Sequence, residues 1–150
     1  MQRKRFLIAT DGSPGGCEAV RTGLMLARGA GADVTIVYAR HAPLRVYGDP
    51  FYQRSLSREL ELARVALDAA SSDAEIVGIE VETEIVEGRP AEAIVELARS
   101  RDADLILVGS RGRGAIAGAV LGSVSESVVR RADRPVLVVK PRPQAARQVA

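Results

Sequence analysis

Four small residues in the last third of the chain form the pattern best suited to chemistry, Gly109-x2-Gly112-x9-Gly122-Ser123. Glycine has no Cβ, so its backbone N–H group can come close to an anion. The N–H groups in the first turn of a helix have no partner within that helix and point toward such an anion. Glycines placed before the start of a helix therefore predict a site for phosphate groups.

Two predicted elements flank this pattern and would hold it in place. The apolar run before it, Asp104–Val108, is typical of a buried parallel strand. After it, the spacing predicts a helix over Val124–Arg131 with Ser123 as its N-cap. Strand, glycine loop and capped helix start together form an arrangement that binds phosphates.

Two other glycine motifs explain this stretch less well. A P-loop requires Gly-Lys followed by Ser or Thr, which is missing here. The segment Gly112-x-Gly114-x-x-Ala117 matches a relaxed dinucleotide fingerprint, but that fingerprint opens a helix directly and precedes an acidic residue at the next strand end. Here the predicted helix begins only at Ser123, and Asp133 comes before the last strand. The spacing therefore disfavours both lysine-based NTPase chemistry and an NAD site.

The whole chain alternates predicted strands with predicted helices. Strands are expected over 6–10, 34–38, 81–86, 104–108 and 135–140, and helices over 16–28, 56–70, 90–98 and 124–131. Such alternation implies a parallel sheet with right-handed crossovers and helices on both faces. We therefore expect an α/β fold, a Rossmann-like open five-stranded parallel sheet in the order 3-2-1-4-5. Charged residues alternate along 81–86, which predicts that this strand lies at an edge.

This strand order predicts where a ligand would bind. Ligands of open parallel sheets lie at the carboxyl ends of the strands, where the order reverses. Asp11, after the first strand, and the glycine loop, after the fourth, would meet there. The Asp11 carboxylate could instead cap the first helix or its turn, and the glycines could serve only a tight turn. His41, the only histidine, is expected in a solvated loop near this place.

Composition indicates one domain with an aliphatic core. Of the 150 residues 47% are hydrophobic and 3% aromatic, which favours a core of Val, Ile, Leu and Ala. We expect a single domain over 1–140 and a flexible tail over 141–150. No run approaches the roughly 18 apolar residues of a membrane span, and the basic N-terminus lacks the longer apolar segment of a secretory signal. The expected location is the cytoplasm, with no membrane partner.

Charge is distributed unevenly along the chain. Residues 105–150 carry eight basic and only two acidic side chains, against a net charge of +2 for the whole protein. A positive segment around the glycine loop favours an anion there, although a solvated basic face would give the same count. Nucleic acid is not expected as a partner, because stacking aromatics are scarce and no known reader motif occurs.

Four stretches of the chain, in order, resemble the universal stress protein family, in its ATP-binding branch. They are 8–13 (IATDGS), 104–112 (DLILVGSRG), 121–126 (LGSVSE) and 134–139 (RPVLVV). With the spacing of the glycine pattern, the resemblance covers nearly the whole chain.

The resemblance implies a nucleotide pocket built largely from backbone. In ATP-binding members the aspartate at the first strand end, here Asp11, contacts the adenosine part, and the backbone near Ala39 reads the adenine edge. Gly109 lies by the ribose, the rest of the glycine pattern holds the phosphates, and Arg111 could add charge toward them. The expected nucleotide-binding set is Ala9, Thr10, Asp11, Ala39, Val108, Gly109, Arg111, Gly112, Gly122, Ser123 and Val124.

The resemblance also implies a function, a nucleotide-dependent regulatory or stress-response module that binds ATP. Hydrolysis would be slow at most, because the sequence shows no poised general base and no paired carboxylates for two metals. Any magnesium would be held chiefly by the ATP phosphates. Members of the family commonly dimerise through the last strand, here Val136–Val139, so a homodimer and a protein partner of unknown identity are expected. A weak ATPase or adenylyl-transferring enzyme of this fold, and an interaction protein without a nucleotide, remain alternatives.

Overall fold

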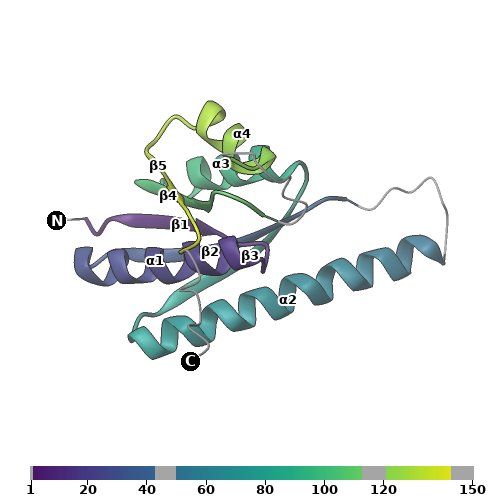
Figure 1. The fold of residues 1–150 in the computed structure, drawn as a ribbon, viewed down its shortest axis with the longest axis horizontal. Helices are drawn as coiled ribbons and strands as arrows, with labels where there is room; N and C mark the ends of the chain where they lie inside the picture. The colour runs from purple at the N-terminus through teal and green to yellow at the C-terminus, as the bar shows by residue number, and fades with distance from the viewer. Residues whose placement is uncertain (1, 43–49, 113–120, 143–150) are drawn as a thin grey trace, which may run out of the picture.

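The computed structural model describes residues 2–42, 50–112 and 121–142. Strands and helices alternate through these residues, as the sequence predicts (Figure 1). In chain order they are β1 (Arg5–Ala9), α1 (Pro14–Ala30), β2 (Asp33–Arg40), α2 (Phe51–Val77), β3 (Val81–Glu87), α3 (Pro90–Ser100), β4 (Leu105–Gly109), α4 (Ser123–Arg131) and β5 (Val136–Val139). The predicted strand bounds differ from these by two residues at most.

The five strands form one parallel sheet in the order β3-β2-β1-β4-β5. The predicted fold and strand order are therefore confirmed, and β3 lies at an edge as expected. In register, Ile8 of β1 stands between Ile36 of β2 and Leu107 of β4. The order reverses between β1 and β4, so the ends of these two strands lie side by side.

Helices cover both faces of the sheet (Figure 1). On one face α1 and α2 pack over Ile8, Ile36 and Leu107, which are completely buried. On the other face α3 and α4 pack over the alternate strand residues, among them Leu7 and Ile106. Since the central strands are buried on both sides, they read as continuous apolar runs in the sequence.

Helix α2 differs most from its prediction, because it runs from Phe51 to Val77 rather than over 56–70. Its N-terminal turns project beyond the sheet (Figure 1), so apolar residues there have little to pack against. Phe51 is 63% exposed and Leu60 39% exposed. Apolar residues recur in this helix at spacings of three and four; of these, Ala63, Leu67 and Ala70 are buried and Leu56 is partly buried, whereas Leu60 is exposed.

The predicted tail over 141–150 lies outside the described residues except for its first two positions. The loop expected to contain His41 is described only as far as residue 42, and the middle of the glycine loop, 113–120, also lies outside the described residues. None of the helices in the described part of the chain is both long and apolar enough to cross a membrane.

Candidate functional site

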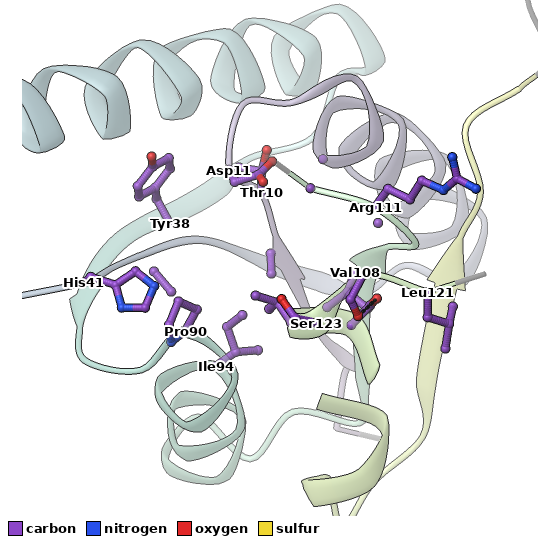
Figure 2. A pocket seen from close by; sticks show the side chains of 18 of the residues that line it. Thr10, Asp11, Tyr38, His41, Pro90, Ile94, Val108, Arg111, Leu121 and Ser123 are labelled. Carbon is purple, nitrogen blue, oxygen red and sulfur yellow. Dashed lines mark hydrogen bonds between the residues drawn. The ribbon is translucent and has the colours of Figure 1, made fainter. Parts of the chain in front are cut away.

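A cavity of about 400 Å³ lies at the carboxyl ends of β1, β2 and β4, beside the point where the strand order reverses (Figure 2). This volume falls within the usual range of small-molecule sites. All eleven residues expected to hold a nucleotide line it: Ala9, Thr10, Asp11, Ala39, Val108, Gly109, Arg111, Gly112, Gly122, Ser123 and Val124. The structure therefore brings together residues that are up to 115 positions apart, from Ala9 to Val124.

The turn after β1 is held by three side-chain oxygens. Thr10 Oγ1 accepts a hydrogen bond from the Gly12 N–H group at 3.2 Å, and Asp11 Oδ1 accepts from the Ser13 N–H group at 2.9 Å. Ser13 itself is the N-cap of α1, since its Oγ accepts from Gly16 N at 3.1 Å. Asp11 thus stabilises the turn and does not cap the helix.

The Asp11 carboxylate is also close to the glycine loop. A Cβ added at Gly112 would lie 2.4 Å from Asp11 Oδ2, and one added at Gly16 would lie 2.9 Å from Oδ1. A side chain at Gly112 is therefore excluded unless the carboxylate moves, and one at Gly16 would also meet Thr10 Oγ1 at 2.8 Å and Asp11 N at 3.0 Å. Asp11 fits between the start of α1 and the loop only because glycine occupies both neighbours.

Gly109 allows a second close approach, between β4 and α1. A Cβ at Gly109 would come within 2.7 Å of the Gly15 backbone, and one at Gly15 would come within 2.2 Å of the Arg111 carbonyl oxygen. Glycine at 109 therefore has a packing reason of its own, whether or not a ribose lies beside it. If Gly109 has no role in ligand binding, the reason for a glycine here is this close packing of two backbone segments rather than a tight turn.

Helix α4 starts without a side-chain cap. Its N-cap is Gly122, with φ −72° and ψ 163°, and Ser123 is the first helical residue. The prediction of Ser123 as N-cap is therefore wrong by one position, because the extended N-cap conformation falls on Gly122. Within the described residues, the first N–H groups of α4 consequently have no capping side chain and remain for solvent or a ligand. Ser123 is exposed at the cavity, beside the exposed Val124.

The cavity has two chemically different ends (Figure 2). Tyr38, His41, Pro90 and Ile94 lie on one side, where Tyr38 is 4% and Ile94 2% exposed. Arg111 lies on the opposite side, by the glycine loop, and is exposed to solvent. A ligand with an apolar, flat part and an anionic part matches this arrangement. The described residues contain no cluster of three or more His, Cys, Asp or Glu that could hold a metal ion by itself.

Residues 2–140 match the family model of the universal stress protein family. The chain belongs to that family. Among its relatives, the "universal stress protein in QAH/OAS sulfhydrylase 3′region" of Thermus aquaticus is 37% identical over 138 residues. Those residues make up 91% of this chain and 98% of the relative.

Solved structures of the family resemble this one over nearly their whole length. Universal stress protein MJ0577 of Methanocaldococcus jannaschii has a TM-score of 0.82 at 27% identity, covering 95% of this chain and 99% of that one. A universal stress protein solved in complex with cAMP has a TM-score of 0.69 at 31% identity, covering 95% and 100%. The fold of this family member is therefore that of its relatives.

Sequence reasoning misses part of the cavity wall of this family member. Those residues are Gly16, Glu59, Pro90, Ile94, Leu121 and Ser125. Pro90 and Ile94 belong to the predicted third helix, and Glu59 to the second. Periodicity predicts which face of a helix is buried, but it does not predict which of its turns lies beside the carboxyl ends of the strands. Ser125 lies three residues after Gly122 and is 3% exposed. A serine in the first turn of this helix, next to the glycine pattern, is the signal that could have found it.

Proposed function

We propose that this universal stress protein binds ATP in the cavity at the ends of β1, β2 and β4, within a domain over 1–140. In this proposal it acts as a nucleotide-dependent regulatory module. The observation that carries the proposal is the meeting of the glycine loop, the uncapped start of α4 and an apolar wall in one cavity. Backbone N–H groups at a helix start bind phosphates, and an apolar wall accommodates a base.

The fit can be followed from residue to residue. The adenine would lie by Tyr38 and Ala39, where base contacts come mainly from the end of β2. The phosphates would lie by Gly112 and Gly122, where a Cβ at Gly122 would already approach the Ser110 carbonyl oxygen to 3.3 Å. The cAMP complex of a similar protein supports an adenine nucleotide as the ligand class. It also makes cAMP the second nucleotide to be tested.

Catalysis is proposed to be slow at most. Glu59 and Asp11 are the carboxylates in the described cavity wall, and Asp11 Oδ1 already accepts from Ser13 N. The described residues hold no group of three or more His, Cys, Asp or Glu side chains that could hold a metal ion, so magnesium would be carried by the phosphates. A weak ATPase or adenylyl-transferring activity remains the alternative that turnover measurements address.

The proposed module is a cytoplasmic homodimer. β5 pairs with β4 on one side, and no described strand pairs with its other edge. A second copy could pair there, strand against strand, which would cover an otherwise open sheet edge. Binding of ATP would then be signalled to a protein partner that has yet to be identified.

The experiment that tests the function starts from the purified protein. Any nucleotide released on denaturation is identified, and ATP and cAMP are titrated calorimetrically into the nucleotide-free protein, with phosphate release assayed in parallel. Saturable ATP binding without steady turnover is the expected result. Steady phosphate release would favour the enzyme alternative, and absence of any nucleotide binding would favour the interaction protein.

A matched pair of glycine variants then locates the site. Gly122→Val places a branched side chain in the path of the phosphates and should abolish ATP binding with the fold retained. Gly29→Val is the control, because a Cβ added at Gly29 of α1 would meet no other atom within 4 Å. It should bind ATP like the wild type. Equal affinity in both variants would contradict the assigned site.

A further inference from the structure

Two segments on either side of the glycine loop meet at one backbone carbonyl group. The Ser110 carbonyl oxygen accepts a hydrogen bond from Gly122 N at 2.6 Å and another from Ser125 Oγ at 3.1 Å. Ser110 is 2% exposed and Ser125 is 3% exposed. The end of β4 and the start of α4 are therefore joined twice at a place from which water is excluded.

The Ser125 hydroxyl has a second acceptor within reach. Its Oγ lies 3.0 Å from the Gly122 carbonyl oxygen, which also accepts the first helical hydrogen bond of α4 from Glu126 N at 3.0 Å. A serine hydroxyl carries a single proton, so the two carbonyl groups share it. One side chain thus connects Ser110, Gly122 and the first turn of α4.

We propose that Ser125 is a positioning residue for nucleotide binding, whose hydroxyl holds the two ends of the glycine loop together. The inference rests on the proposed function, because the N–H groups of the first residues of α4, directly after Gly122, are the groups assigned to the phosphates. Holding them in place before the ligand arrives reduces the ordering cost of binding. Buried hydrogen bonds also hold geometry better than exposed ones.

Helix formation alone does not account for this serine. Alanine has a higher helix propensity than serine, and the Ser125 hydroxyl donates to carbonyl groups and so caps none of the N–H groups of α4. What the hydroxyl adds is the link to Ser110, fifteen residues earlier in the chain. The affinity for a nucleotide would depend on this link, because it fixes the start of α4 relative to the end of β4.

The test compares Ser125→Ala with two companion variants. Ser125→Ala should weaken ATP binding by about three- to tenfold, the effect of one hydrogen bond, mainly through faster dissociation. Ser125→Cys replaces the hydroxyl with a slightly larger and much weaker donor and should resemble Ser125→Ala, whereas Ser125→Thr keeps the hydroxyl and should restore much of the affinity. Ser127→Ala is the control, since Ser127 Oγ accepts from Arg131 Nε and lies outside the loop junction. Wild-type affinity in Ser125→Ala would overturn the positioning role.

A second measurement needs no nucleotide. Hydrogen exchange at the Gly122 N–H group should be several-fold faster in Ser125→Ala than in the wild type or Ser127→Ala, because its acceptor carbonyl is held less firmly. Unchanged exchange would show that the Ser125 hydroxyl does not hold the two ends of the loop together. If the wild type fails to bind ATP, the proposed function is refuted, and the exchange result alone then tests this role of Ser125.

Discussion

At the residue scale, the Asp11 carboxylate shows why the glycines of the loop serve the protein as well as a ligand. One carboxylate oxygen accepts from Ser13 N, and the other lies where a Cβ of residue 112 would come within 2.4 Å of it. A side chain at 112 would have to turn the carboxylate away and so weaken the turn after β1. The effect of such a substitution on ligand binding is therefore coupled to its effect on the fold.

A double-mutant cycle measures this coupling. Gly112→Ala should lower the free energy of unfolding by about 1–3 kcal/mol, because the added methyl group overpacks against the carboxylate. In an Asp11→Ala background the clash is absent, so the same substitution should cost clearly less. Urea unfolding of the four proteins gives the coupling energy directly. Additive effects would show that the carboxylate is not what excludes a side chain at residue 112.

The residues of the cavity also show what a sequence can and cannot predict at this scale. The eleven residues expected from the family resemblance share one cavity because each lies at a strand end or in the glycine pattern, and the strands follow from periodicity. The sequence correctly predicts that Ser123 lies at the cavity but wrongly makes it the N-cap of α4. N-capping depends on the backbone conformation of Gly122, and the burial of Ser125 depends on packing. Neither is encoded in the local spacing.

At the element scale, a glycine in α1 allows this helix to pack closely against the sheet. A Cβ at Gly23 would lie 2.5 Å from Ile8 Cδ1 and 3.3 Å from Leu107 Cδ2, and both neighbours are fully buried. The helix can therefore approach β1 and β4 more closely there than any larger residue would allow. Gly29, six residues later in the same helix, has open space around it.

These two glycines should respond in opposite directions to the same substitution. Gly23→Ala should lower the free energy of unfolding by about 1–3 kcal/mol through overpacking. Gly29→Ala should raise it by about 0.5–1 kcal/mol, because alanine loses less backbone entropy in a helix. Thermal and urea unfolding of both variants check the pair. Stabilisation by Gly23→Ala would mean that the contact between α1 and β1 is looser than the structure shows.

Helix α2 shows why elements are predicted better than their ends. Its apolar spacing over 56–70 reflects contact with the sheet, and Ala63, Leu67 and Ala70 are indeed buried. Its first turns continue past the sheet, where no burial imposes a pattern on the sequence. The strands, which lie against the core, are predicted to within two residues for the same reason. Their periodicity is produced by the packing itself.

At the scale of the whole molecule, acid should destabilise the fold through carboxylates that are hydrogen-bonded in the native state. The backbone N–H group of Arg5 donates to Asp104 Oδ2 at 2.9 Å, which lowers the pKa of Asp104 below its usual 3.8. The Arg134 guanidinium likewise lowers the pKa of Asp133. Since the native pKa lies below the unfolded one, the stabilisation is complete above the ordinary value and is lost as the pH falls through the native value.

The corresponding prediction concerns Asp104→Asn. Wild-type stability should be flat near neutral pH and should fall once the pH drops below about 4. Asp104→Asn should be less stable than the wild type at pH 7, and the difference should shrink toward zero at low pH, where the carboxyl group is protonated in both states. Urea unfolding from pH 7 to pH 3 follows this difference. A constant difference over the whole range would exclude linkage to the Asp104 carboxyl group.

The proposed homodimer makes a prediction about the outer edge of β5. Ile106 N donates to Pro135 O and Ser110 N to Val139 O, so alternate residues of β5 face β4. The backbone groups of Val136 and Val138 therefore point to the opposite edge, where a second copy would pair. Val138→Pro removes an N–H group from that edge and leaves the bonds to β4 in place.

Sedimentation equilibrium should accordingly find the wild type at about twice the chain mass of 15.9 kDa and Val138→Pro at the mass of one chain. Val138→Thr, which keeps both the N–H group and a β-branched side chain, should remain dimeric. No residue of β5 lines the described cavity, so Val138→Pro should still bind ATP. As a monomer it should show no cooperativity between the two ATP sites of a dimer. A dimeric Val138→Pro would show that the copies meet elsewhere, since a strand edge that lacks this donor cannot form a continuous ladder.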